Sequence, residues 1–257
     1  MRIHVFGRTF MDLFVYGEQV HDAMIVETPG GSALNAACGL SLLGHNAVLH
    51  GTVGTDHHGS QIVQTVNQYG VNTQYLRQIA GSSNRFIARN DRAIAVQLGA
   101  GSDKEVVADM KDVQEDFCLI FATEISLEAI QALVNKPFKG LFIDLGPKYS
   151  QRLFPLPVYE GLILGNETEA QNNPCDVIKL GEKGAKWHEV DVPGNEKRLP
   201  YTIGAGDLFD VVVVDGVIKQ KDPQNILREA VALSQKACLI PGSSTKIEIL
   251  RDYHHYV

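Results

Sequence analysis

Short apolar runs alternate with amphipathic segments along most of this chain. Residues 2–6 (RIHVF) form an apolar run that ends at a glycine, and they predict a first strand. Residues 32–44 place leucines and alanines at helical spacing and also end at a glycine, so they predict a helix. A strand over residues 47–54 and a helix over residues 59–70 repeat this order.

The alternation resumes after Asp103 with an acidic helix start. A helix is predicted over residues 126–134 with Ser126 as its N-cap. Apolar strands are predicted over residues 118–122, 140–145 and 161–165. Short strands separated by amphipathic helices are typical of a mostly parallel sheet that is covered by helices on both faces. The predicted fold is therefore a three-layer α/β/α sandwich.

Two segments, at about residues 14–28 and 85–98, break this rhythm. Both are β-like and have no helix inside them. The second contains RNDR, which predicts a hairpin turn. We expect them to form a small antiparallel β lid over the main sheet. No linker and no fixed-period repeat is visible, so the prediction is a single domain over residues 1–257 with this lid.

Composition and charge narrow the class of function. The 257 residues suffice for one sizeable core, and the formal net charge of -7 argues against nucleic acid as a partner. The four cysteines lie far apart without a CxxC pair, which favours free thiols in a reducing compartment over a zinc site. The N-terminal residues lack a secretion-signal pattern, and no stretch approaches the ~20 apolar residues of a membrane span. We expect a cytoplasmic protein that acts on a small molecule, with no membrane partner.

A cluster of small residues precedes a lone aspartate at Gly204-Ala205-Gly206-Asp207. If a helix follows, these residues form its first turn, where backbone N–H groups without internal partners bind anions. Small side chains would let a phosphoryl group approach those N–H groups, and Asp207 would lie beside it to accept a proton from an attacking hydroxyl. Taken alone, the tetrapeptide is explained equally well as a glycine turn with a solvated aspartate.

Three other motifs each allow a functional and a purely structural interpretation. Gly30-Gly31 lies before a predicted helix with Asn35 one turn into it, which suits ligand contact or a simple turn and helix cap. Asn166 and Glu169 would share a helical face and suit a hydrated magnesium ion, or they form a polar helix start with Asn166 as N-cap. The segment KLGEKGA (179–185) makes a turn after a strand, which by itself indicates a hairpin loop.

Together and in this order, the motifs resemble the ribokinase-like (PfkB) carbohydrate kinase family over nearly the whole chain. GGSALNAACGLSLLG, followed ten residues later by Gly54, is similar to the family's N-terminal signature. NETEA is similar to its Asn-x-x-Glu motif, GAGD to its catalytic motif, and GTVGTDHHG and LGAGS to further family segments. The resemblance implies an α/β sheet with a β lid and transfer of the γ-phosphate of ATP to a sugar or nucleoside hydroxyl, with Mg²⁺. It also suggests a homodimer through the lid.

The same resemblance implies roles for individual residues. It makes Asp207 the general base and the backbone of Gly204, Ala205 and Gly206 the anion hole. The residues that match substrate-binding positions are Asp12, Gly30, Gly31, Asn35 and Glu124. Those that match nucleotide-binding positions are Asn166, Lys179, Gly181, Gly184 and Gly242. Asn166 and Glu169 match the magnesium positions, with the ion held through water. For Asp12 and Glu124, a solvated loop acid stays the alternative.

The chain also departs from the family pattern. Tyr201 stands where the family usually has an aspartate that often helps to hold a monovalent cation, and Ile203 replaces a common threonine. We therefore expect turnover to be indifferent to potassium. The interval between Asn166 and the KLGEKGA turn is short, so the nucleotide side is trimmed and no adenine contact can be assigned. Ser32, where phosphosugar kinases of the family often carry lysine, disfavours a sugar phosphate as acceptor.

The leading hypothesis is an ATP- and magnesium-dependent kinase that acts on a small unphosphorylated sugar. A nucleoside kinase of the same fold is the nearest alternative. A kinase-like binding or regulatory protein with weak activity is a third hypothesis, which Tyr201 and the trimmed nucleotide side favour. The presence of every carboxylate and amide of the motifs disfavours it, because degeneration would more often remove the base first.

Overall fold

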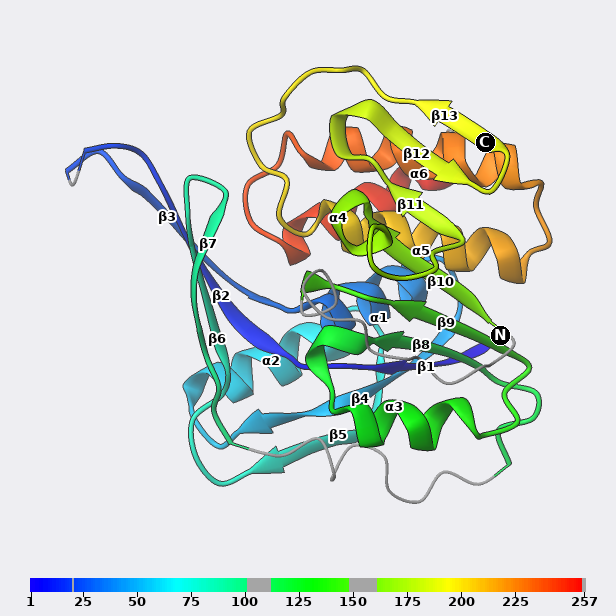
Figure 1. Cartoon of the computed structure of the whole chain (residues 1–257). Helices are drawn as coiled ribbons and strands as arrows, with labels where there is room; N and C mark the ends of the chain where they lie inside the picture. Colours follow the sequence, from blue (N-terminus) through cyan, green and yellow to red (C-terminus); the bar gives the residue numbers. More distant parts are fainter. Residues whose placement is uncertain (20, 101–111, 148–160, 256–257) are drawn as a thin grey trace.

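A nine-stranded sheet forms the centre of the protein (Figure 1). The structure is a computed structural model, and it describes residues 1–19, 21–100, 112–147 and 161–255. The strand order is β13-β12-β11-β10-β9-β8-β1-β4-β5. These strands are β1 (Arg2–Phe6), β4 (Asn46–Gly54), β5 (Asn72–Ile79), β8 (Phe117–Phe121), β9 (Gly140–Asp144), β10 (Leu162–Asn166), β11 (Val177–Lys179), β12 (Gly184–Trp187) and β13 (Val190–Pro193). Every pair from β5 to β11 is parallel, and only the last two strands pair antiparallel, which confirms the mostly parallel sheet.

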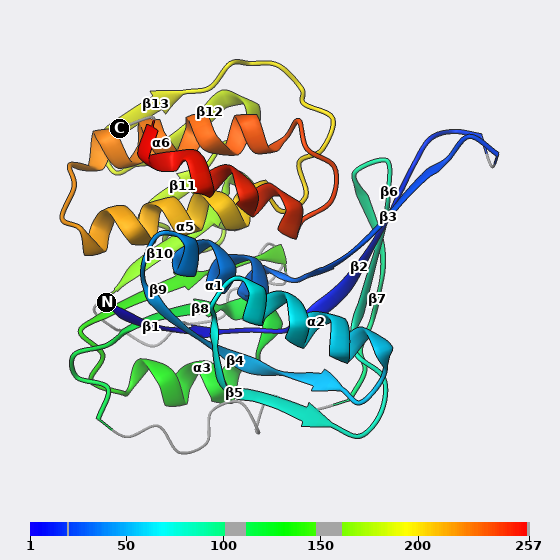
Figure 2. The ribbon, with the colours of Figure 1, turned by 180° about the vertical axis from the view of Figure 1, so that it is seen from behind.

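Helices cover both faces of this sheet. One face carries α1 (Ser32–Leu42), α2 (His57–Gln68), α5 (Ala205–Ile218) and α6 (Pro223–Ala237), together with the 3₁₀ segment Ser244–His255 (Figure 2). The other face carries α3 (Leu127–Val134). Ser126 accepts a hydrogen bond from the N–H of Ala129 and so caps α3, as the sequence predicts. The acidic helix start expected after Asp103 lies outside the described residues.

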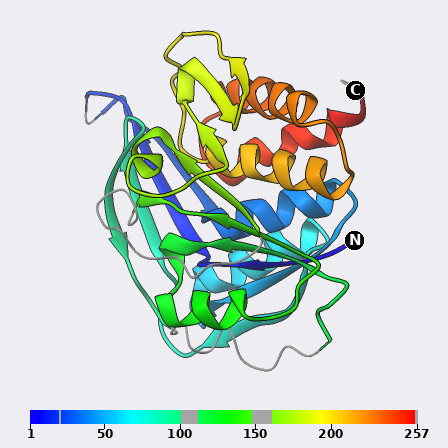
Figure 3. The same ribbon diagram turned by 45° about the vertical axis from the view of Figure 1, so that its right-hand side comes forward.

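A second, four-stranded sheet stands across the carboxyl ends of the parallel strands (Figure 1). It consists of β3 (Met24–Gly30), β2 (Phe10–Tyr16), β6 (Arg85–Arg89) and β7 (Arg92–Gln97), in that order. Asn90 and Asp91 form the predicted turn between β6 and β7, with φ of 46° and 60°. The central pair, β2 and β6, is parallel, and the two outer pairs are antiparallel. Figure 3 shows this sheet at one side of the molecule, with α5 and α6 extending away from it.

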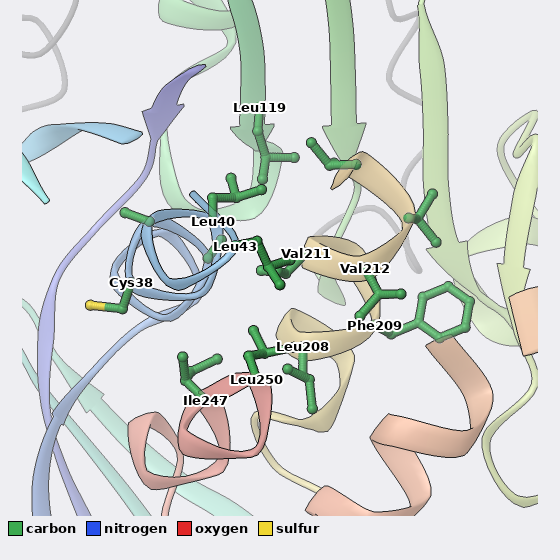
Figure 4. Packing of buried hydrophobic residues seen from close by; sticks show 14 of the residues in the cluster. Cys38, Leu40, Leu43, Leu119, Leu208, Phe209, Val211, Val212, Ile247 and Leu250 are labelled. Carbon is green, nitrogen blue, oxygen red and sulfur yellow. The ribbon is translucent and has the colours of Figure 1, made fainter. Parts of the chain in front are cut away.

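The apolar core between α1 and α5 places the site. The run Val211–Val214 is fully buried in α5, so packing holds a helix whose β-branched residues have low helical propensity (Figure 4). The two helices approach closely at Gly39, because a Cβ there would lie 2.9 Å from Cγ2 of Val211. Leu250 of the C-terminal 3₁₀ segment packs into the same cluster. The first turns of α1 and α5 are therefore fixed against each other by the core.

No helix among the described residues is long and apolar enough to cross a membrane. Residues 167–170 form only one helical turn, α4 (Glu167–Ala170), between β10 and β11. This agrees with the trimmed connection that the short sequence interval predicts.

Candidate active site

The first turns of α1 and α5 meet at one point. Asn35 Nδ2 in α1 donates a hydrogen bond of 2.7 Å to Oδ2 of Asp207 in α5. Helix α5 begins at Ala205, with Gly204 as its N-cap in the left-handed region at φ 85°. A Cβ on Gly204 would also lie 3.0 Å from Cα of Ser243, so the turn requires glycine. The GAGD segment is thus the first turn of a helix, as predicted, and its N–H groups can bind an anion.

The Asp207 carboxylate is half-buried at this junction. Burial raises the pKa of Asp207, and hydrogen bonds from the Asn35 and Ser32 side chains lower it. The negative charge of Asp144 adds to the rise, and the positive charge of Lys179 opposes it. A carboxylate with a raised pKa accepts a proton more readily, which suits a general base.

One polar atom of the Asn35 side chain, Oδ1, has no hydrogen-bond partner among the described residues. Because its Nδ2 donates to Asp207, its Oδ1 faces away from that carboxylate, and this buried oxygen has no hydrogen-bond partner among the described residues. A buried acceptor without a partner is costly and points to a donor that a ligand supplies.

Asp12 lies within β2 and is only 3% exposed, so it is not a solvated loop acid. Ser243 Oγ donates a hydrogen bond to its Oδ2. A Cβ on Gly30 would lie 2.0 Å from that same oxygen, so the glycine allows the carboxylate to approach. Burial raises the pKa of Asp12 to about 7. Gly31, the N-cap of α1 at φ 93°, completes the turn that brings Asp12 and Asn35 to the same end of α1.

Glu124 lies directly after β8 and is also buried, at 7% exposed. Its Oε2 accepts a hydrogen bond of 2.8 Å from the N–H of Arg8, and its Oε1 accepts one of 3.1 Å from the N–H of Ser32. Burial raises the pKa of Glu124 to about 8, which these amide donors oppose. The carboxylate thus holds the start of α1 against the end of β1. Its predicted contact with substrate stays a prediction.

A buried ion cluster of Lys179, Asp144 and Asp210 lies beside the GAGD turn. The two aspartates belong to none of the sequence motifs described above. Lys179 Nζ lies 2.5 Å from Oδ2 of Asp144 and 3.0 Å from both carboxylate oxygens of Asp210. Asp144 ends β9, and Asp210 follows Asp207 by three residues, so it lies on the same face of α5. These two carboxylates raise the pKa of Lys179 despite its burial, which keeps a positive charge next to the anion-binding turn.

A cavity of about 200 Å³ opens beside this turn. Lys179, Gly181 and Gly184 line it with Ala205 and Gly206, which brings three predicted nucleotide-binding residues to the anion-binding turn. Its remaining wall is mixed, with basic, polar and apolar side chains that include Lys197, Arg198, Leu199, Phe209, Val231, Ser234 and Gln235. Ser234 Oγ and Gln235 Nε2 are buried without a partner in the described part of the chain. Gly242 does not line this cavity; it lies beside Tyr16, whose hydroxyl accepts a hydrogen bond from its N–H.

Asn166 and Glu169 bind each other. Asn166 caps α4 through hydrogen bonds from the N–H groups of Thr168 and Glu169, and Glu169 Oε2 accepts one of 2.8 Å from the N–H of Asn166. Asn166 Nδ2 also donates to Glu169 Oε1 at 2.7 Å. The structural interpretation of this motif as a helix cap is therefore confirmed. No group of three or more His, Cys, Asp or Glu side chains converges as a metal cluster within the described ranges.

The small sheet reaches the site through the turn between β6 and β7. The Asp91 carboxylate accepts hydrogen bonds from the N–H of Thr202 at 2.7 Å and of Ile203 at 3.1 Å, and also from the Thr202 hydroxyl. The ring of Tyr16 in β2 meets that of Tyr201 edge-on at 4.8 Å. A carboxylate from the small sheet thus holds the segment just before the GAGD turn, and the local sequence around that turn gives no sign of it.

A model of the pfkB family carbohydrate kinases matches residues 2–129. The chain belongs to this family. Two of the curated relatives that match at low identity are both sugar kinases by name. The deoxyribokinase of Salmonella typhi is 22% identical over 302 residues, which cover 100% of this chain and 99% of the relative. The ribokinase of Bacillus subtilis is 26% identical over 270 residues, which cover 89% of each protein.

Solved structures show the ribokinase-like fold over the whole chain. A ribokinase from Cryptococcus neoformans in complex with ADP matches with a TM-score of 0.79 at 17% identity and covers 100% of this chain and 99% of its own. A nucleoside kinase from Methanocaldococcus jannaschii matches with a TM-score of 0.74 at 17% identity and covers 98% of each chain. Kinases named for a sugar and for a nucleoside acceptor therefore share the fold of this chain.

Proposed function

We propose that the protein transfers the γ-phosphate of ATP to a hydroxyl of a small, unphosphorylated sugar. The observation that carries this proposal is the Asn35 amide, which bonds Asp207 through Nδ2 and leaves Oδ1 buried and unpartnered among the described residues. A sugar hydroxyl is both donor and acceptor, so it can donate to Oδ1 while the neighbouring hydroxyl faces the carboxylate. The Asn35 amide would thus contact the acceptor and the general base at the same time.

In this proposal Asp207 accepts the proton of the attacking hydroxyl. Its raised pKa supports that role. The backbone N–H groups of Gly204, Ala205 and Gly206 stabilise the charge that develops on the transferred phosphoryl group. Asp12 accepts hydrogen bonds from other hydroxyls of the sugar, and Glu124 holds the start of α1 at this site.

The cavity next to the GAGD turn is the proposed ATP site. Lys179, Lys197 and Arg198 give it positive charge for phosphates, and Gly181 and Gly184 form the turn at its edge. Two ribokinases of the same fold support ATP as the co-substrate, because the Cryptococcus neoformans protein was solved with ADP and an Arabidopsis thaliana protein with ribose and ATP. Gly242 is not part of the proposed ATP site; it belongs to the loop whose Ser243 bonds Asp12.

Magnesium would be held through water near Asn166 and Glu169. Their side chains already bond each other, so they suit an ion that keeps most of its own water shell. Bound with ATP, the ion would neutralise phosphate charge. Asn166 and Glu169 would only orient that hydrated ion.

The small sheet is proposed to act as a lid within a single kinase domain over residues 1–257. Its segments are those predicted at about residues 14–28 and 85–98, and Asp91 holds it against Thr202. Several apolar side chains on it are exposed, which supports the predicted homodimer through the lid; they are Met24, Ile25, Ile94, Val96 and Leu98.

The test is a panel of sugars, sugar phosphates and nucleosides, assayed for ADP release with purified protein, ATP and Mg²⁺. We expect turnover with at least one unphosphorylated sugar and little with sugar phosphates. A preference for nucleosides by more than tenfold in kcat/KM would assign the nucleoside alternative. Binding of ATP or acceptor without turnover on the whole panel would overturn the proposal in favour of a binding protein.

A further inference from the structure

Lys246 is a fully buried lysine, with 0% of its surface exposed, in the C-terminal 3₁₀ segment. Its Nζ donates a hydrogen bond of 2.6 Å to the carbonyl oxygen of Ile240 and another to that of Gly242. Within the described residues, no carboxylate oxygen lies within 4.0 Å of this nitrogen. Lysine is almost never fully buried without a paired acid, so this ammonium is unusual.

Burying an ammonium on carbonyl oxygens alone is costly, and an apolar side chain of the same length would avoid that cost. Burial lowers the pKa of Lys246 to about 8, and the charges of Asp91 and Asp207 are among those that oppose the fall. The side chain therefore remains positively charged at neutral pH. A costly charge that is nevertheless kept points to a use for that charge.

The loop that Lys246 holds contacts both the GAGD turn and the proposed acceptor-binding residue Asp12. Ser243, next to Gly242, packs against Gly204 at the N-cap of α5 and donates a hydrogen bond to Asp12. At the start of the same loop, the carbonyl of Cys238 accepts a hydrogen bond of 3.1 Å from the N–H of Tyr201. Any shift of residues 240–243 would therefore move the anion-binding turn and the acceptor-binding carboxylate together.

We propose that Lys246 is a positioning residue whose ammonium acts as a built-in monovalent cation beneath the GAGD turn. Carbonyl oxygens are the ligands that replace the water shell of an alkali ion in proteins, and here Nζ takes that place between two of them. Because the cation is covalently tethered, its occupancy does not depend on the salt in solution. The effect on turnover rests on the proposed kinase function, whereas the effect on the loop does not.

Two substitutions distinguish the effect of the Lys246 charge from that of its side-chain volume. Lys246→Met removes the charge and keeps most of the volume, and Lys246→Ala removes both and leaves room for a free cation. Lys139→Met, at a partly exposed lysine on the connection between α3 and β9, is the matched control. All proteins are compared in potassium, ammonium and tetramethylammonium chloride at one ionic strength, by kcat and KM on the best acceptor and by thermal unfolding.

We expect wild type and Lys139→Met to be indifferent to the cation. Lys246→Met should lose roughly 10-fold to 100-fold in kcat in every salt, with the KM of the acceptor less affected, because a displaced anion hole misplaces the phosphoryl group. Lys246→Ala should be rescued several-fold by potassium or ammonium. It should also unfold about 3–5 °C higher in potassium than in tetramethylammonium, if potassium is present at about ten times its Kd.

Turnover of Lys246→Met within twofold of wild type, or equal unfolding temperatures of Lys246→Ala in all three salts, would overturn the inference. So would several-fold activation or stabilisation of wild type by potassium, a measurement that stands even if neither variant folds. If no protein turns over any acceptor, the proposed function fails, and the cation-specific stabilisation of Lys246→Ala still decides the role of Lys246.

Discussion

Glu124→Gln tests whether this carboxyl group is a buried structural acid. The pKa of Glu124 is raised from 4.5 to about 8, chiefly by burial. Since the folded protein binds this proton more tightly than the unfolded chain, the stabilisation is complete below about pH 4.5 and is lost as the pH rises through about 8. From pH 6 to pH 9 the wild type should lose roughly 2–3 kcal/mol through this group, and a glutamine cannot titrate.

The assay is thermal unfolding of wild type, Glu124→Gln and the exposed control Glu189→Gln at pH 6 and pH 9. At roughly 2–4 °C per kcal/mol for a chain of this size, the wild type should lose about 5–10 °C more than Glu124→Gln between the two pH values. Glu189→Gln should follow the wild type. Parallel losses in all three proteins would refute the reasoning. A large rise in the Kd of the acceptor for Glu124→Gln, with unchanged stability, would instead make Glu124 a substrate ligand.

Three further substitutions examine the lid and the acceptor side. Asp91→Asn should lower kcat about 3-fold to 10-fold with little change in the ADP Kd, because the bonds to Thr202 and Ile203 are only partly shielded from water; unchanged kcat would remove the lid contact from the mechanism. Asp12→Ala should weaken acceptor binding roughly 10-fold to 100-fold, because the acceptor loses its hydrogen bonds to a buried carboxyl group, whereas calorimetry should show ADP binding unchanged. Gly30→Ala should weaken acceptor binding similarly although the charge is retained, since its Cβ would lie 2.0 Å from the Asp12 carboxylate; an acceptor Kd equal to that of wild type would show that Asp12 does not bind the acceptor.

Much of the fold follows from the sequence, because the relevant signals are local. Strands such as β8 and β9 are short apolar runs, and the turn at Asn90 and Asp91 carries residues that tolerate positive φ. The parallel pairing of β2 with β6 is different. It depends on two segments separated by β3, α1, β4, α2 and β5, and no local pattern encodes such a register.

Residues of the candidate site could be predicted where they belong to a recognisable sequence motif. Asp207 and Asn35 belong to separate motifs, and the structure brings them within 2.7 Å. Asp91 was missed because its partners, Thr202 and Ile203, lie in a distant segment. Lys246 was missed although it bonds nearby carbonyls, because a lone lysine in a sequence is normally a solvated residue. Asp210 gave a usable signal, since it follows Asp207 by three residues on one helical face.

Rapid-quench measurement of phosphoryl transfer by Asp207→Asn tests the central claim most directly. Wild type, Asp207→Asn and the exposed control Asp252→Asn are compared on the best acceptor of the panel, with ADP binding measured by calorimetry. If Asp207 is the general base, the transfer rate should fall roughly 100-fold to 10,000-fold in Asp207→Asn alone, with the ADP Kd within about twofold of wild type. A transfer rate for Asp207→Asn close to that of wild type would contradict the assignment of Asp207 as the base.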